Sequence, residues 1–239
     1  MQIPVKPGLI TVALMLAALP FNTAVADGIV VSKIYDPYVQ PLETEIEWRF
    51  VSQDSERDPD IQKQSIGVGR SLTDRWAVEF YAIAKKGSGE SLSVDAYELE
   101  AQWQLTEQGE YAVDWGLLFE LEREINANAW EFAATLLAAR DFGRTTVTAN
   151  FGLIYEGGER IKNEFESILR MQMRYRMKET FEPSLEVHVG QDTTAIGPTI
   201  GGLMRVSGGR KLRWDLGLFA GITERSPDHI LKANIEFEF

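Results

Sequence analysis

The sequence contains no cysteine and only two histidines among its 239 residues. Without cysteine the chain has no disulfide framework, no thiolate ligands for a metal and no attachment point for a lipoprotein anchor. Basic residues are also scarce, since 24 lysines and arginines stand against 36 acidic residues and give a net charge of −12. A nucleic-acid partner is therefore not expected, because phosphate binding needs a basic surface.

Long apolar runs are absent as well, apart from one between Leu9 and Leu19. This run is shorter than the roughly 20 apolar residues that a membrane-spanning helix needs. Lys6 precedes it, and Ala24-Val25-Ala26 follows with the small-x-small pattern that is typical of a signal-peptidase site. The sequence therefore predicts a signal peptide over residues 1–26, cleaved after Ala26, with a buried N-terminal helix as the alternative. Residues 27–239 then form one mature domain, whose net charge changes from −12 to −13 because only Lys6 is lost.

The mature chain alternates between apolar and polar residues with a period of two. Such a period sends successive side chains of a strand to opposite faces. Over residues 97–105, for example, Tyr97 and Trp103 share one face whereas Glu98 and Glu100 share the other. About twelve segments of about ten residues follow this pattern, which is the length of a tilted strand that crosses a bilayer. They are 42–50, 61–70, 74–84, 97–105, 111–122, 128–139, 145–156, 164–177, 181–190, 195–206, 212–221 and 230–239, of which 61–70 and 195–206 alternate least clearly.

One face of these segments is apolar and rich in aromatic residues, and the other carries most of the charge. Aromatic residues near the ends of the apolar stripes are expected of the girdles of a membrane barrel. The sequence thus predicts an all-β fold, a transmembrane antiparallel up-and-down β-barrel of about 12 strands in the cell outer membrane. A soluble barrel or sandwich is the alternative, but its strands average about five or six residues.

The connections between the segments bear on orientation. Those after odd-numbered segments are longer on the whole, such as 53–59, whereas the one after the second segment is short (72–74). Short turns on one side and longer loops on the other are typical of membrane barrels. We therefore expect both ends of the barrel chain on the periplasmic side. No connection is long enough to be an obvious lid or plug.

The last nine residues alternate and finish on an aromatic carboxyl terminus, Phe237-Glu238-Phe239. This segment is expected to close the barrel. It also resembles the terminal signal by which outer-membrane barrels are recognised for assembly. The partners expected from the sequence are therefore outer-membrane lipid, the barrel-assembly machinery through Phe239, and a small-molecule solute.

Two segments resemble a particular family. Gly67-Val68-Gly69-Arg70-Ser71-Leu72-Thr73-Asp74-Arg75-Trp76-Ala77-Val78 resembles an early hairpin of the phenol meta-degradation-pathway outer-membrane proteins. Gly217-Leu218-Phe219-Ala220-Gly221-Ile222-Thr223-Glu224-Arg225-Ser226-Pro227-Asp228 is similar to their penultimate hairpin. The resemblance implies a channel-like or transporter-like role, and it supplies no catalytic residues.

Candidate chemistry is sparse. Ser184 and His188 share a face, but four residues along a strand span about 13 Å, which is beyond hydrogen-bond reach. His188 is expected to face the lumen, and His229 to lie in the last external loop. No spacing of histidine and acidic residues indicates a metal site. We therefore expect no enzymatic activity, no catalytic residue, no cofactor and no metal.

The charged face defines the candidate site, because it would line the barrel lumen. Acidic residues dominate its first half and arginines its second, which predicts two opposing walls. Either these walls face a water-filled channel for small polar or aromatic-acid-like solutes, or they pair as Glu/Arg ion pairs that fill a structural barrel. The candidate lumen-lining residues are Glu43, Glu45, Glu47, Glu98, Glu100, Asp114, Glu120, Glu122, Arg170, Arg174, Arg176, Arg205 and Arg213, with Glu79 and Glu131 on the same face.

Overall fold

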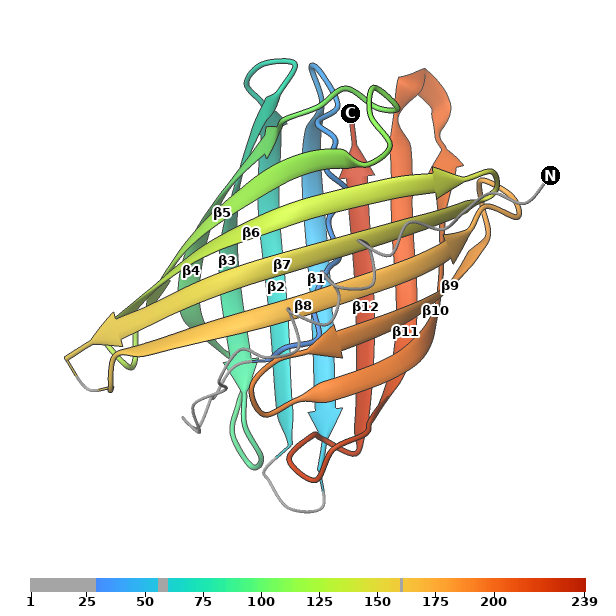
Figure 1. Ribbon diagram of the computed structural model, residues 1–239. Coiled ribbons are helices and arrows are strands. Elements are labelled where there is room, and N and C mark those ends of the chain that lie inside the picture. The colour runs from blue at the N-terminus through green and yellow to red at the C-terminus, as the bar shows by residue number, and fades with distance from the viewer. Residues whose placement is uncertain (1–28, 56–59, 160) are drawn as a thin grey trace.

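The computed structural model describes residues 29–55, 60–159 and 161–239, so the predicted signal peptide lies outside the described residues. These residues form twelve strands that close into one antiparallel barrel (Figure 1). In chain order the strands are β1 (Thr44–Asp54), β2 (Ile61–Ser71), β3 (Trp76–Lys86), β4 (Ser93–Gln104), β5 (Asp114–Glu124), β6 (Ala129–Phe142), β7 (Thr145–Gly158), β8 (Glu164–Tyr175), β9 (Glu182–Val189), β10 (Thr194–Arg205), β11 (Lys211–Gly221) and β12 (His229–Glu238).

Each strand pairs with its neighbours in sequence, and β1 closes the barrel by pairing with β12. Two backbone hydrogen bonds of 3.1 and 2.8 Å between Thr44 and Phe239 complete this seam. The predicted barrel of about 12 strands is therefore confirmed, and the two least regular segments are strands β2 and β10. His229 is the first residue of β12 rather than part of the preceding loop.

The outer surface accounts for the period-two pattern. On β6, Trp130 and Phe132 point outward and are 52% and 49% exposed. The residues of opposite parity on the same strand, such as Ala129, Ala133 and Thr135, point inward and are buried. Large apolar side chains point outward in the same way from most of the other strands. Among the described residues, no helix has both the length and the apolar character needed to cross a membrane.

We call the end of the barrel where β1 begins and β12 ends the near end, and the opposite end the far end; the near end is uppermost in Figure 1. The longest connection, 105–113 between β4 and β5, lies at the near end. The tightest one lies there too, where Gly143 takes the positive φ of 66° that a two-residue turn between β6 and β7 requires. Connection length therefore does not orient this barrel, contrary to the expectation from the sequence.

The described residues that precede β1 run through the inside of the barrel. This lumen segment (residues 29–43, blue in Figure 1) runs from the far end to the near end and reverses at Pro41-Leu42 into β1. Its hydrogen bonds reach β4, β5, β7 and β12, which surround the interior on several sides. The N-terminal segment thus occupies the lumen, although no connection between strands is long enough to do so.

Candidate functional site

At the far end the lumen segment is held by apolar packing. Val31 is fully buried in a cluster with Val51, Ala195, Phe219 and Ile230, and Ile29 packs against this cluster. The strands leave room for the segment here, since a Cβ atom built on Gly190 would lie 2.6 Å from a methyl group of Val30. Burial of this apolar surface stabilises the far end of the segment, and Arg170 Nε also donates to the Val30 carbonyl at 3.0 Å.

Beneath this cluster lies a fully buried charged network. Lys232 Nζ donates to Glu186 Oε2 at 2.7 Å, and the same oxygen lies 2.9 Å from His188 Nε2. Gln172 donates to the other carboxylate oxygen of Glu186 at 2.8 Å, and the His188 ring meets Phe219 edge-on at 5.1 Å. The carboxylate is therefore fully engaged, as a buried charge must be.

His188 and Ser184 do not form a catalytic pair in the described residues. His188 faces the interior, as expected, but its partner is Glu186. The Ser184 hydroxyl instead donates to the backbone carbonyl of Thr199 at 3.3 Å. A serine nucleophile needs a hydrogen-bonded base, and this geometry does not provide one.

At the centre of the lumen Arg49 lies between two tyrosine rings. Its guanidinium carbon is 4.1 Å from the ring centroid of Tyr81 on β3 and 5.4 Å from that of Tyr35 in the lumen segment. Nη1 donates to Glu100 and Nη2 to Glu47, both at 2.8 Å, and the Tyr35 hydroxyl donates to Glu100 at 2.9 Å. Cation–π contacts and charge-assisted hydrogen bonds together fix the middle of the segment.

Two inward-facing glycines make this arrangement possible. Gly67 on β2 lies opposite Tyr81, and a Cβ atom there would clash with the Tyr81 ring at 2.2 Å. The bare backbone of Gly67 therefore lets the ring lie flat beneath Arg49. Gly116 on β5 accommodates the segment in the same way, since a Cβ there would be 3.1 Å from Pro37.

Polar contacts hold the rest of the segment. Lys33 Nζ lies 3.0 Å from both Glu47 and Glu236, so it bridges β1 and β12. The Tyr35 amide donates to the side chain of Asn150 at 2.7 Å. The Asp36 carboxylate accepts from Arg174 at 3.0 Å and thereby reaches β8. These contacts tie the segment to opposite sides of the barrel.

Toward the near end the contacts are single hydrogen bonds. The Tyr38 hydroxyl donates to Asp114 at 2.8 Å, and the Val39 amide donates to the Gln104 side chain at 2.8 Å. Ser71 donates to the carbonyl of Gln40 where the segment leaves the lumen. The segment is thus held at the near end without an apolar cluster of its own among the described residues.

A cavity of about 380 Å³ lies beside the near-end half of the segment, against β1 and β8–β12. Nine carboxylates and six lysines or arginines contribute to its wall. At its mouth Lys211 bridges Glu43 and Glu238 at 3.0 and 2.6 Å. Burial and, next in size, a hydrogen bond with Glu238 raise the pKa of the Glu43 carboxyl to about 7, although Lys211 opposes this shift. The cavity is therefore polar and densely charged.

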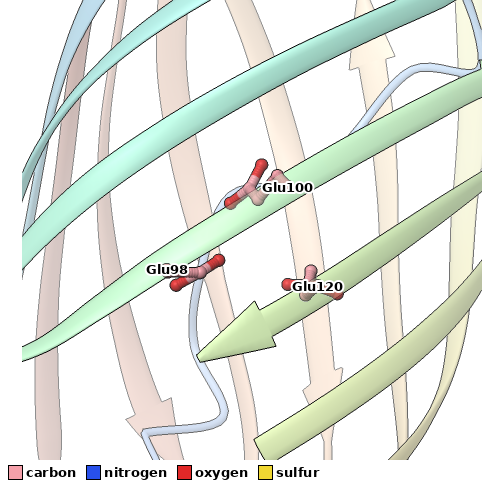
Figure 2. Close-up of side chains that lie close together, drawn as sticks. All are labelled: Glu98, Glu100 and Glu120. Atoms are coloured by element: carbon pink, nitrogen blue, oxygen red, sulfur yellow. The ribbon is translucent and has the colours of Figure 1, made fainter. Parts of the chain in front are cut away.

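Glu98 and Glu100 on β4 and Glu120 on β5 form a separate acidic trio near the centre (Figure 2). One oxygen from each lies within 4.8 Å of the others. These groups already have protein partners, because Glu100 accepts from Arg49 and Tyr35 and shares a hydrogen bond with Glu98. Thr135 donates to Glu120 at 3.3 Å. We therefore assign no cation to the trio.

The structure places twelve of the thirteen candidate lumen residues inside the barrel or on the wall of the cavity. Arg205 is different: its side chain is 70% exposed and pairs with Glu179 at 2.5 Å, because it is the last residue of β10 at the near end. Those that face the interior are Glu43, Glu45, Glu47, Glu98, Glu100, Asp114, Glu120, Glu122, Arg170, Arg174, Arg176 and Arg213.

The observed ion pairs differ from the two opposing walls of charge that the sequence predicted. The glutamates of β1 and β4 are neutralised locally, by Lys33 of the lumen segment and by Arg49 of β1 itself. The arginines of the second half find other partners, such as Asp36 for Arg174 and Glu238 for Arg213. The predicted Glu/Arg pairs between two walls are therefore replaced by pairs through the segment, pairs between adjacent strands, and pairs between strands that are not neighbours, such as Arg49 of β1 with Glu100 of β4.

Several interior residues were missed by the sequence analysis. The missed residues on strands could have been found from alternation, because they fall on the same alternate positions as the candidate lumen-lining residues. Tyr81, for example, follows Glu79 at a spacing of two. For Lys33 and Tyr35 alternation gave no signal, since the residues before β1 do not alternate. The missed residues are Lys33, Tyr35, Asp36, Tyr38, Arg49, Lys63, Tyr81, Glu186, Asp215, Lys232, Glu236 and Glu238.

Comparisons with known proteins support the barrel fold. No protein-family model matches the chain, and no curated protein matches its sequence. Among solved structures, an outer-membrane channel from Pseudomonas putida F1 is similar with a TM-score of 0.62 and 13% identity, covering 87% of this chain and 99% of that chain. The KdgM porin, in complex with disordered oligogalacturonate, is similar with a TM-score of 0.53 and 11% identity, covering 82% and 98%.

A third similar structure is the β domain of the Bordetella autotransporter BrkA, with a TM-score of 0.52 and 12% identity, covering 83% of this chain and 99% of that chain. Similarity at such low identity shows the fold alone. The resemblance to the phenol-pathway family stays a prediction, because none of these comparisons identifies that family. The closed barrel of twelve antiparallel strands, with its apolar outer surface and polar interior, has the fold of the outer-membrane β-barrel porins and channels.

Proposed function

We propose that this protein is an outer-membrane channel for small polar solutes whose lumen segment keeps it nearly closed at rest. The observation that carries the proposal is the course of residues 29–43 through the interior. Polar groups of the barrel bind this segment where solute and water would otherwise pass. The porin-like fold supports a channel, and the segment explains how its permeability is restricted.

The apolar outer surface and the resemblance of the Phe239 terminus to an assembly signal support placement in the outer membrane. In this placement lipid surrounds the barrel and the assembly machinery recognises the C-terminal strand.

The interior favours polar solutes over apolar ones. The cavity wall is dominated by charged groups, and the centre of the lumen is filled by ion pairs. An aromatic acid is not favoured, because most lysines and arginines on the cavity wall already pair with carboxylates of the protein. We therefore retain the small polar solute as the proposed cargo and not the aromatic acid.

The test is conductance in a planar bilayer. Wild-type protein should show small or infrequent openings, because the segment fills the lumen. A variant that lacks residues 29–40 should conduct several times more current per channel, since wide water-filled barrels conduct freely. A synthetic peptide of residues 29–40, added to the deletion variant, should lower the current again.

If the deletion prevents assembly, Tyr35→Ala provides the same comparison at full chain length. It removes the hydrogen bond to Glu100 and the ring beside Arg49. More frequent openings than in wild type are expected. A deletion variant that assembles in its heat-modifiable form but conducts no better than wild type would overturn the proposal.

That outcome would favour the second candidate function, a structural or interaction barrel with a permanently filled lumen. Its specific support is the density of central ion pairs, where Arg49 contacts both Glu47 and Glu100 at 2.8 Å. In this case the ion pairs alone would be sufficient to block the lumen when the segment is absent.

A further inference from the structure

We propose that the near-end cavity is a binding site for a small organic cation that carries N–H donors, such as a primary amine. The inference rests on the proposed channel function and deepens it by naming the solute class. The site consists of the cavity wall formed by the lumen segment, β1 and β10–β12.

The cavity has the size of a small-molecule site. Its volume of about 380 Å³ lies within the range of known ligand pockets, roughly 300–1,000 Å³. The lumen segment forms one side of it, so a bound solute would touch the segment directly. A ligand here could therefore influence how the segment is held.

Three side-chain oxygens of residues that line the cavity are buried and have no hydrogen-bond partner. They are Oε1 of Glu47, Oγ1 of Thr199 and Oδ1 of Asp215, the last of which lies 3.5 Å from Lys232 Nζ. The other oxygen of Glu47 already accepts from Lys33 and Arg49. Because a buried polar atom without a partner is costly, these oxygens favour a ligand that donates hydrogen bonds.

The charges on the wall also favour a cation. Several of its cations already face two carboxylates, as Lys33 does between Glu47 and Glu236 and as Arg213 does beside Glu236 and Glu238. Glu45 lines the cavity as well and has no ion-pair partner among the described residues. A bound cation would therefore supply the ion-pair partner that Glu45 lacks.

An anion fits less well. One buried donor on the wall, Nε of Arg174, makes no hydrogen bond, but it lies 3.6 Å from a Glu182 oxygen and its Nη2 pairs with Asp36 at 3.0 Å. Its charge is thus already compensated. An anionic ligand would have to displace these carboxylates and would face the remaining ones.

The test uses three probes of one length and different charge: 1,4-diaminobutane, 1,4-butanediol and succinate. Binding to the full mature protein in detergent micelles is measured by titration calorimetry at about 10 mM salt, where the screening length is about 30 Å. The diamine should bind with measurable heat. The diol and succinate should bind at least tenfold more weakly.

Two variants localise the site. Glu45→Gln removes the unpaired carboxylate, and Thr199→Val removes the unpartnered hydroxyl at nearly constant volume. Each should weaken diamine binding about fivefold, which is the size of one partly exposed ion pair or one hydrogen bond. The matched control is Glu90→Gln, in the exposed connection between β3 and β4 at the far end, and it should bind like wild type.

Equal or tighter binding of succinate, or no detectable diamine binding at millimolar concentration, would overturn the assignment. Diamine binding that the Glu45 and Thr199 variants leave unchanged would overturn it too, because the cation would then bind elsewhere. Equilibrium binding does not require transport. If the protein binds the diamine but never conducts, the proposed channel function is wrong and the proposed cation site is still supported.

Discussion

The two ends of the lumen hold the same segment by different forces. At the far end, Val31 and its neighbours form a dry apolar cluster over a fully buried charged network. At the near end, Tyr38 and Val39 make single hydrogen bonds beside a polar cavity. Apolar packing has no substitute in water, whereas a hydrogen bond at a wet surface exchanges readily with a water molecule.

This difference indicates the order in which the segment would leave the lumen. The near-end contacts are expected to open first, because the bond from Tyr38 to Asp114 is only partly buried and water can replace it as it breaks. The central contacts around Arg49 follow, and the apolar cluster is released last. Partial opening would thus enlarge the cavity while the far end stays sealed.

The largest effect is expected from Arg49→Leu at the centre, between the two ends. Glu47 and Glu100 would lose a buried cationic partner. Removing one member of a buried pair costs about 3–5 kcal/mol, so the urea midpoint of unfolding in micelles should fall strongly.

The matched control for this variant is Arg205→Leu. Arg205 forms an exposed pair with Glu179, with side chains 70% and 48% exposed. Exposed pairs contribute about 0–1 kcal/mol, so the midpoint should hardly move. Equal midpoints for the two variants would contradict the importance of the central pairs.

A smaller effect is expected from Val31→Thr at the far end. The change keeps the shape of the side chain but buries a hydroxyl in an apolar cluster, at a cost of about 1–3 kcal/mol. Spontaneous openings in a bilayer should become more frequent. The same substitution at the exposed Val206 should change nothing, and identical opening rates for both would show that the far-end cluster does not hold the segment.

The smallest effect is expected from Tyr38→Phe at the near end. It removes one hydrogen bond, to Asp114, which contributes about 0.5–1.5 kcal/mol. Because water can reach this position, the unfolding midpoint should change less than in Val31→Thr. A larger loss in Tyr38→Phe than in Val31→Thr would reverse the order of the two ends.

The barrel could be predicted from the sequence because a strand exposed to lipid on one face must alternate. Trp130 and Phe132 point outward, and the charged residues between the apolar ones point inward, wherever the strand lies in the barrel. Even the glycine-rich β10 keeps this order, with Ile196 and Ile200 outward and Thr199 inward. Alternation therefore predicts both the fold and most of the interior residues.

The contents of the lumen could not be predicted in this way. Contacts such as Lys33 with Glu236 join residues with no local pattern in common, and they depend on how the closed barrel folds around them. The mixed sequence from Val30 to Tyr38, with valines, tyrosines and isolated charges, was a weak hint, since a solvated linker seldom carries such large apolar side chains. Alternation places Arg49 on the same inward face as Glu47. It does not show that Arg49 is the ion-pair partner of Glu47 and Glu100.

The lumen segment also constrains how the protein is made. Lys33 and Glu236 are 203 residues apart in sequence. Contacts between such distant residues form late in folding, because closing a long loop lowers the entropy of the chain. The segment continues directly into β1, and β1 forms the seam with β12. The lumen segment can therefore make its contacts with β12 only after the last strand of the barrel has been synthesised.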